Sequence, residues 1–308
     1  MGGSARPAVA IVPGGDQDIF DAAEGGGARL VEPPDAEAVI WTDPAHPEDL
    51  QRLLESSPAT WVQLPFAGIE KFVAAGVIDP DLTWTCAKGI YGPTCAEHAL
   101  GFMLASSRLF YEHIGATSWV PEGSETRLKA STVLIFGTGG IGRSLADMLE
   151  PIGSRVLAVN RSGKPLDGAE RTERTEALPE LLPEADFVVV AASLTPETKG
   201  LFNETVFGPM KSSAWLVNVA RGGLVDTDAL VAALKENGIG GAALDVTDPE
   251  PLPDGHPLWS MPNVIITPHV ANTWSMGLPE LAAMVHRNVA KYAAGEPLEG
   301  LVDPSSGY

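Results

Sequence analysis

The sequence predicts an α/β protein built from two doubly wound parallel sheets. Short apolar strands alternate with helical stretches along most of the 308 residues, which is typical of parallel strands joined by crossover helices. From residue 133 onward the alternation is more regular, with six candidate strands in succession. The first of these strands runs into a glycine-rich turn, 137–142, and then into a helix. The length suits two domains of ordinary size.

The first expected domain consists of residues 1–92 together with the end of the chain, 275–308. A last helix, 278–294, is expected to return and pack on this domain, because chain ends commonly lie close together. The strands expected here are 8–12, 29–31, 39–41, 60–63 and 82–85, and the helices are 16–24 and 47–55.

The second expected domain covers residues 93–274, with a hinge near Tyr91–Thr94. Thr94-Cys95-Ala96-Glu97 has the S/T-x-x-E pattern of a capping box and predicts a helix that runs to about Arg108. Segment 118–130 is polar, contains proline and glycine, and is expected to be a loop. The strands expected after it are 133–136, 155–159, 187–190, 215–219, 240–244 and 264–267, and the helices are 143–150, 176–182 and 227–236. Six strands are the count of a complete Rossmann dinucleotide-binding domain.

The composition excludes several classes of protein. A net charge of −20 argues against a surface for nucleic acid or anionic membrane, since both need clustered Lys and Arg. Two cysteines, Cys86 and Cys95, give neither a disulfide framework nor the spacing of a metal site. No apolar run is long enough for a membrane span and the N-terminus lacks a signal-peptide core, so a cytoplasmic protein is expected.

The glycine turn reads Gly137-Thr138-Gly139-Gly140-Ile141-Gly142, a G-x-G-x-x-G motif between a strand and a helix. In that context the motif suits a dinucleotide pyrophosphate, because glycines allow close backbone approach and the helix N-terminus offers free N–H groups. Taken alone it is equally compatible with a plain glycine-rich turn. The segment is also one residue away from the P-loop of an NTPase, with Arg143 in place of the lysine.

Arginine, carboxylate and histidine follow strands of the second domain at the edge where such sheets bind ligands. Arg221 follows the fourth strand, Glu250 lies beyond the fifth, and His269 directly follows the sixth. Reduction of a carbonyl by hydride needs a proton donor, and a carboxylate beside an imidazole stabilises its charged form. The guanidinium offers a planar fork to a substrate carboxylate. Taken singly, each residue has a purely structural alternative. His269 could be a turn or packing residue, Glu250 could face solvent, and Arg221 could only pair with Asp226.

The end of the second strand favours NADP(H) over NAD(H). NAD sites usually carry Asp or Glu here, whereas this chain reads Asn160-Arg161-Ser162 with Lys164 close by. An arginine at this point accommodates a ribose 2′-phosphate. The alternative is that Arg161 points to solvent and the site accepts either cofactor.

Five segments together resemble the D-isomer-specific 2-hydroxyacid dehydrogenases: GTGGIGRSLA (137–146), LTPETKGLFN (194–203), LVNVARGGLVDTDAL (216–230), ALDVTDPEPLP (243–253) and NVIITPHVA (263–271). The resemblance extends to the tail GEPLEGLVDPSSGY and implies a Rossmann domain inserted in a flavodoxin-like substrate domain. It implies Arg221, Glu250 and His269 as the catalytic set and the backbone amides of Ala67 and Gly68 as donors to the substrate carboxylate. It further implies that the cofactor site is lined by Ser193, Leu194, Thr198, Val219, Ala220 and Asp245, with Asn272 near the nicotinamide or the substrate. The helix at 94–108 and the loop after it resemble the family's dimerisation arm, which predicts a homodimer.

The resemblance predicts a reductase of small 2-keto acids of the glyoxylate/hydroxypyruvate type, with His269 donating the proton. Ala191-Ala192-Ser193 departs from the usual lead into Leu194, and Glu70 replaces a common aspartate. Phosphoglycerate is disfavoured because few basic residues lie near the substrate loop, and formate dehydrogenases pair their histidine with glutamine. A cofactor-sensing protein similar to the family's transcriptional corepressors is the alternative outside enzymes, although the chain shows no long appended tail.

Overall fold

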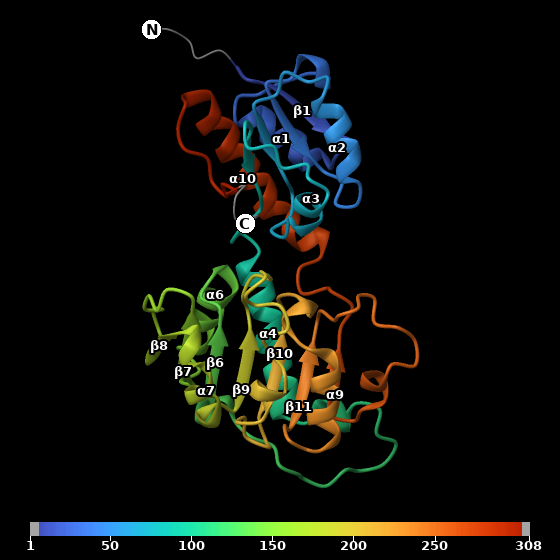
Figure 1. The fold of residues 1–308 in the computed structure, drawn as a ribbon, viewed down its shortest axis with the longest axis vertical. Coiled ribbons are helices and arrows are strands. Elements are labelled where there is room, and N and C mark those ends of the chain that lie inside the picture. The colour runs from blue at the N-terminus through green and yellow to red at the C-terminus, as the bar shows by residue number, and fades with distance from the viewer. Residues whose placement is uncertain (1–5, 304–308) are drawn as a thin grey trace. The chain divides into compact units, whose positions relative to one another are not determined.

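The computed structural model describes residues 6–303. Residues 1–5 and 304–308 lie outside this range. They include most of the N-terminal segment in which no signal peptide was expected, and the last residues of the tail that resembles the family. The chain divides into two compact units, which are described separately. The first unit combines Met1–Tyr91 with Thr273–Tyr308, and the second is Gly92–Asn272 (Figure 1).

The first unit contains a five-stranded parallel sheet in the order β2-β1-β3-β4-β5. Its strands are β1 (Ala8–Val12), β2 (Arg29–Leu30), β3 (Ala38–Trp41), β4 (Trp61–Gln63) and β5 (Thr83–Thr85). Its helices are α1 (Gln17–Gly25), α2 (Pro47–Leu54), α3 (Glu70–Ala74) and α10 (Trp274–Ala294), with a 3₁₀ turn at Pro33–Asp35. Strands β1, β3, β4 and β5 are mostly buried, as expected for a parallel sheet covered by helices, whereas the short edge strand β2 is not.

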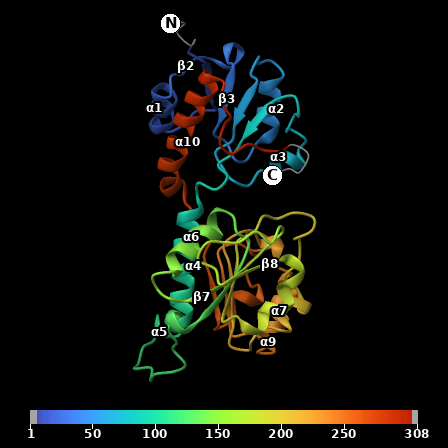
Figure 2. The same ribbon diagram turned by 90° about the vertical axis from the view of Figure 1, so that its left-hand side faces the viewer.

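The last helix packs along α1, as expected from the sequence (Figure 2). Buried Leu281, Val285 and Val289 of α10 join Ile19 of α1 in one apolar cluster. The helix begins at Trp274, four residues before the predicted start, so Pro279 is its sixth residue instead of its second. Pro279 lacks the N–H that would donate to the carbonyl of Ser275, so the second turn of the helix has one backbone hydrogen bond fewer.

The second unit contains a seven-stranded parallel sheet in the order β12-β11-β10-β9-β6-β7-β8. Its strands are β6 (Thr132–Phe136), β7 (Arg155–Asn160), β8 (Arg171–Arg174), β9 (Phe187–Val190), β10 (Trp215–Asn218), β11 (Gly241–Leu244) and β12 (Val264–Ile266). Its helices are α4 (Gly92–Ser107), α5 (Phe110–His113), α6 (Gly140–Leu149), α7 (Leu178–Leu181), α8 (Glu204–Phe207) and α9 (Thr227–Lys235), with 3₁₀ turns at Leu128–Ala130, Thr175–Ala177, Leu182–Glu184, Gly222–Leu224 and Pro257–Ser260. The strand order reverses between β6 and β9, which is where doubly wound sheets bind ligands.

The predicted fold class is confirmed, but the predicted count of six strands in this sheet is wrong. The additional strand β8 pairs with β7 at the edge of the sheet. It reads Arg-Thr-Glu-Arg and none of its residues is buried. An edge strand without apolar residues has no period-two hydrophobic signal, so the sequence pattern did not show it.

Three predicted helix starts also need correction. The helix expected from Thr94 begins at Gly92, so Thr94 lies inside it and the capping box does not form. The Thr94 hydroxyl instead donates to Oδ1 of Asn272. The helix expected from Arg143 begins at Gly140, within the glycine motif. The helix expected at 176–182 is split into a 3₁₀ turn, α7 and a second 3₁₀ turn, because Pro179 and Pro183 lack N–H donors.

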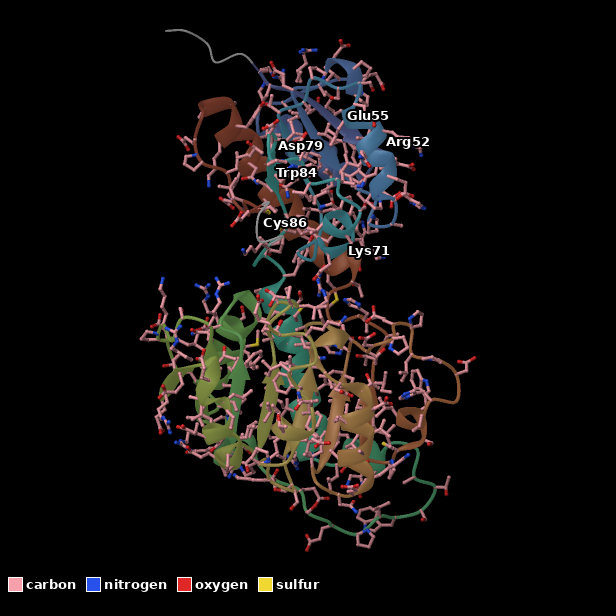
Figure 3. All side chains as sticks on the ribbon, viewed as in Figure 1. Arg52, Glu55, Lys71, Asp79, Trp84 and Cys86 are labelled. Atoms are coloured by element: carbon pink, nitrogen blue, oxygen red, sulfur yellow. The ribbon has the colours of Figure 1, made fainter. Side chains whose placement is uncertain are left out.

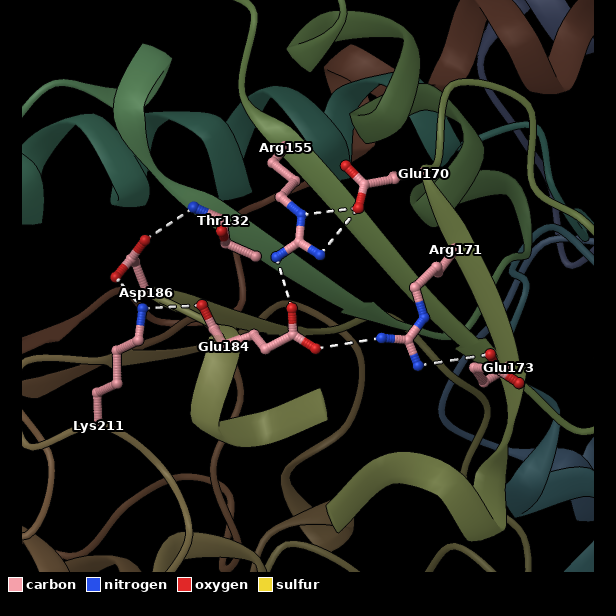
Figure 4. Close-up of polar contacts among 8 residues, drawn as sticks. All are labelled: Thr132, Arg155, Glu170, Arg171, Glu173, Glu184, Asp186 and Lys211. Atoms are coloured by element: carbon pink, nitrogen blue, oxygen red, sulfur yellow. Dashed lines mark hydrogen bonds and ion pairs between the residues drawn. The ribbon is translucent and has the colours of Figure 1, made fainter. Parts of the chain in front are cut away.

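A charged network joins the amino-terminal ends of β6, β7, β8 and β9 (Figure 4). Arg155 contacts Glu170 and Glu184, while Asp186 accepts from the backbone N–H of Thr132 and from Lys211. The two glutamates hold the pKa of Arg155 above its usual value. Because ligands bind doubly wound sheets at the opposite, carboxyl ends, this network is a structural feature of the second unit.

Candidate cofactor and proton-transfer site

The glycine motif forms a tight turn that leads directly into α6. Gly137 has φ of +104°, and a Cβ there would lie 2.6 Å from the backbone of Ala191. A Cβ on Gly142 would lie 2.1 Å from the carbonyl oxygen of Gly137, so both positions require glycine. A Cβ on Gly139, in contrast, would meet nothing within 4 Å. The backbone is therefore open beside the first turn of α6, whose N–H groups lack intrahelical acceptors, and this arrangement fits a pyrophosphate.

The turn after β7 is organised by the side chain of Asn160. Its Oδ1 accepts from the backbone N–H groups of Ser162 and Gly163, and its amide donates to Thr138 of the glycine motif and to the carbonyl of Lys164. The side chain of Asn160 thus shapes the turn and ties it to the glycine motif.

Two arginines lie at this turn, one within it and one on the neighbouring strand β8. Arg161 lies within it, and its charge contributes to holding the pKa of Glu197 below the usual value, after the larger effects of the Thr195 hydroxyl and of the backbone N–H of Glu197. Arg174 ends β8 opposite Asn160, and a Cβ on Gly163 would lie 2.9 Å from its Cγ. The aliphatic stem of Arg174 therefore covers Gly163. The sequence did not single out Arg174, because its strand was not predicted.

The loop after β9 is held against the segment that follows β10. The hydroxyl of Thr198 donates to the carbonyl of Ser193, and the Leu194 side chain lies 3.2 Å from where a Cβ on Gly223 would stand. Backbone bonds from Gly200 and Phe202 to residues 223 and 224 complete the contact. Ser193, Leu194 and Thr198 consequently lie beside the turn that carries Arg221.

The turn that carries Arg221 is held by the buried Asn218, which was not among the predicted site residues. Asn218, 1% exposed, accepts from the N–H of Ala220 and donates to the carbonyl of Arg221, while Val219 is buried between them. The guanidinium of Arg221 donates to the carbonyl of Ala220 at 2.7 Å. A Cβ on Gly222 would lie 1.9 Å from the carbonyl oxygen of Thr247, so glycine is required for this turn to touch the loop of Glu250.

The structure brings Glu250 and His269 together. Nδ1 of His269 lies 2.7 Å from Oε1 of Glu250, and Oε2 faces the backbone N–H of Thr247 at 3.4 Å. Because a carboxylate only accepts hydrogen bonds, Nδ1 is the donor and carries a proton. Nε2, on the far side of the ring, is then the nitrogen that can give or take a proton, and the ring is half exposed.

The turn around His269 is held by Asp245, which is 2% exposed. The backbone carbonyl of Asp245 accepts from the N–H of His269. Its carboxylate accepts from the N–H groups of Val270 and Ala271 and from the hydroxyl of Thr267. These bonds fix His269 at φ of +54°, a left-handed conformation that few non-glycine residues adopt.

Cys95 lies close to this group of residues, on the first turns of α4. Burial raises the pKa of its thiol to about 11, and the charge of Asp245 adds to the effect while Arg221 opposes it. A thiol of this kind stays protonated and is a poor nucleophile. Among residues 6–303, no group of three or more His, Cys, Asp or Glu side chains is arranged to hold a metal ion.

The expected substrate loop lies in the first unit, between β4 and α3. The carbonyl of Phe66 accepts from the N–H of Ala87, and Sγ of Cys86 lies 3.8 Å from the carbonyl oxygen of Ala67. Cys86 and Lys71 are labelled in Figure 3, the former after β5 and the latter on α3. The loop Ala67–Gly68 is therefore fixed to the end of β5.

Known proteins are similar to this chain over most of its length. A family model described as "D-isomer specific 2-hydroxyacid dehydrogenase, NAD binding domain" matches residues 100–271. A Corynebacterium melassecola protein named "Uncharacterized protein in proB 3'region" is 41% identical over 92% of this chain and 94% of its own length. The human "Glyoxylate reductase/hydroxypyruvate reductase" is 38% identical over 67% of this chain, but the match spans 65% of the human protein, slightly less than two thirds.

A solved structure resembles almost the entire chain. The structure titled as a D-isomer specific 2-hydroxyacid dehydrogenase from Xanthobacter autotrophicus Py2 in complex with NADPH and MES has a TM-score of 0.85 and 29% identity. The match covers 99% of this chain and 100% of the chain in that structure.

Within the described part of the chain, no helix is both long and apolar enough to cross a membrane.

Proposed function

This chain belongs to the D-isomer specific 2-hydroxyacid dehydrogenase family, which makes it an NAD(P)-dependent dehydrogenase, and we propose that it reduces small 2-keto acids of the glyoxylate/hydroxypyruvate class. The observation that carries the proposal is the 2.7 Å contact of His269 with Glu250. This pair stands at the carboxyl edge of the sheet that also bears the glycine motif and Arg221. The name of the human relative supports the substrate class.

A nicotinamide cofactor held at the glycine motif 137–142 would supply the hydride that reduces the keto carbon. His269 donates the proton to the developing alkoxide from Nε2, while Glu250 holds Nδ1 and stabilises the charged ring. Arg221 and the backbone amides of Ala67 and Gly68 bind the substrate carboxylate, because guanidinium and N–H groups suit carboxylate oxygens.

The proposed cofactor is NADP(H) in preference to NAD(H), bound at the glycine motif 137–142 with Ser193, Leu194, Thr198, Val219, Ala220 and Asp245 beside it. The turn after β7 carries no carboxylate that could bind a ribose 2′-hydroxyl, whereas Arg161 lies within it and Arg174 on the neighbouring strand β8. An arginine at this position accommodates a 2′-phosphate. The NADPH in the Xanthobacter structure is consistent with this preference.

A panel of initial rates tests the substrate and the cofactor together. Glyoxylate, hydroxypyruvate, phenylpyruvate and 3-phosphohydroxypyruvate are each assayed with NADPH and with NADH. We expect the highest kcat/KM for glyoxylate or hydroxypyruvate with NADPH. A preference for either of the other two acids would overturn the substrate class, and an NADH preference above about tenfold, or 1.4 kcal/mol, would overturn the cofactor proposal.

We also propose that the protein is a homodimer that pairs through α4 and the segment after it. In this segment Trp119 is 94% exposed and Ile114 78% exposed, and Val120 is exposed as well. Large apolar side chains exposed within one short segment support an interaction surface there. Light scattering of the wild type and of Trp119→Ser tests the proposal, since a wild-type monomer at micromolar concentration would refute it.

A further inference from the structure

His98 on α4 was not among the predicted site residues, but it contacts Thr267, in the turn that carries His269, and Asp245, which follows β11. Its Nε2 lies 2.9 Å from the hydroxyl oxygen of Thr267 and 3.6 Å from Oδ1 of Asp245. The ring is kept in place by Phe102, one helical turn later, in an edge-to-face contact with centroids 4.5 Å apart. His98 is therefore fixed on the helix side and reaches the turn with one nitrogen.

The direction of each hydrogen bond between these three side chains follows from the last acceptor, the carboxylate of Asp245. The Thr267 hydroxyl lies 2.6 Å from Oδ1 of Asp245, and a carboxylate can only accept, so the single hydroxyl proton points to Asp245. Thr267 must then accept from His98, which places a proton on Nε2. The result is a one-way series in which His98 donates to Thr267 and Thr267 donates to Asp245.

Asp245 connects these hydrogen bonds to the backbone next to His269. Its carboxylate receives the N–H groups of Val270 and Ala271 at 2.8 and 2.9 Å, and its carbonyl receives the N–H of His269 at 2.8 Å. A buried carboxylate with fewer donors would be free to turn, and the left-handed residue His269 depends on the bonds that hold it.

We propose that His98 is a positioning residue which, through Thr267, fixes the Asp245 carboxylate and so sets the orientation of His269. This inference rests on the proposed role of His269 and adds a residue that does not itself contact the substrate. It assigns to α4 a task in the reaction besides packing on the sheet.

Hydrogen exchange of the protein without cofactor tests the structural half of the proposal. In His98→Leu and in the near-isosteric Thr267→Val, the amides of Val270 and Ala271 should exchange about tenfold faster, whereas those of β9 should not change. His98→Gln, whose amide can donate in place of Nε2, and Thr267→Ser should keep the protection. His113→Gln, which alters a histidine paired with Glu125, is the matched control. Unchanged exchange at 270–271 in both variants, or equal acceleration throughout the second unit, would overturn the proposal.

Kinetics test the functional half. His98→Leu should lower kcat about tenfold, the cost of a misplaced proton donor, with rescue by His98→Gln and no comparable change in KM for the keto acid. The double variant with Thr267→Val should be no worse than either single change, because both break one series. An unchanged kcat in His98→Leu beside an inactive His269→Ala would refute this inference alone. Full turnover by His269→Ala would refute the proposed proton donor instead.

Discussion

Nδ1 of His269 lies 2.7 Å from Oε1 of Glu250, a contact between two loops that follow neighbouring strands, β12 and β11. The turn of His269 is fixed by Asp245, and the loop of Glu250 touches the turn of Arg221 at Gly222. Three segments of the chain are thus held together by hydrogen bonds to the Asp245 carboxylate, by the His269–Glu250 pair and by the backbone contact at Gly222. The pair forms part of a rigid frame, which is what a proton donor needs.

Replacing Glu250 by Gln separates charge from orientation. The glutamine oxygen can still accept from Nδ1, so the ring should keep its place, but the negative charge that stabilises the imidazolium is lost. We expect kcat for keto-acid reduction to fall by about 10- to 100-fold, and His269→Ala to lose roughly 10²- to 10⁴-fold. Steady-state rates with saturating NADPH measure both, with unchanged NADPH binding as the control. Wild-type turnover in Glu250→Gln would show that its charge has no part in the reaction.

The two arginines beside the Asn160 turn should determine the cofactor preference. Arg161→Ala and Arg174→Ala should each weaken the binding of 2′,5′-ADP and NADPH about tenfold, because a charge-assisted hydrogen bond contributes roughly 1.5–3 kcal/mol. Binding of NADH and of 5′-ADP should hardly change, since these lack the 2′-phosphate. Calorimetry measures all four ligands, and Arg52→Ala, on α2 of the first unit, serves as the matched control. Equal losses for NADPH and NADH would mean that the arginines bind some other part of the cofactor.

Much of this architecture could be predicted because its signals are local. Buried strands such as Phe187–Val190 are continuous apolar runs, and the glycine turn is required by backbone contacts that any side chain would block. The family, the α/β class and the dehydrogenase class were all predicted from the sequence and are confirmed. The roles of Arg221, Glu250 and His269 stay predictions.

The features that were missed depend on tertiary contacts. Strand β8 is polar and exists because it pairs with β7, so Arg174 could not be placed beside Gly163. Thr94 has the sequence of a helix cap, but its hydroxyl bonds to Asn272, far along the chain. His98 looked like an ordinary helix residue until the fold placed it against Thr267. Asn218 is an exception among the missed residues, because a polar residue near the carboxyl end of a predicted apolar strand can be recognised in the sequence.

Cys95 should be unreactive in the folded protein. Burial first, and then the charge of Asp245, raise the pKa of its thiol from 9.0 to about 11, so at pH 8 the thiolate fraction is about 100-fold lower than in the unfolded chain. Alkylation by iodoacetamide, followed by mass spectrometry, should be slower by about that factor than in guanidinium chloride. Burial also raises the pKa of Cys86, which should behave in the same way. Rapid labelling of native Cys95 would show that α4 opens readily at its first turns.

Glu299 should stabilise the first unit in a pH-dependent manner. Its carboxylate contacts Arg287 and Lys291 of α10 at 3.0 and 2.7 Å, and its backbone N–H donates to buried Asn288. Arg287 first, and then Lys291, hold its pKa below the ordinary value of 4.5. A carboxyl whose pKa is lower in the folded state stabilises the fold above the unfolded value, and this contribution disappears as the pH falls through the folded value.

The change Glu299→Gln should therefore lower the apparent Tm at pH 7 by a few degrees, about 1 kcal/mol for a partly exposed pair. The difference from the wild type should shrink below about pH 4.5, where the unfolded carboxyl takes up its proton, and it should also shrink at high salt. Scanning calorimetry across pH measures this, with Glu296→Gln, an exposed neighbour, as the control. A Tm difference that is constant from pH 7 to pH 3 would show that the side chain acts through packing, since only its charge responds to protonation.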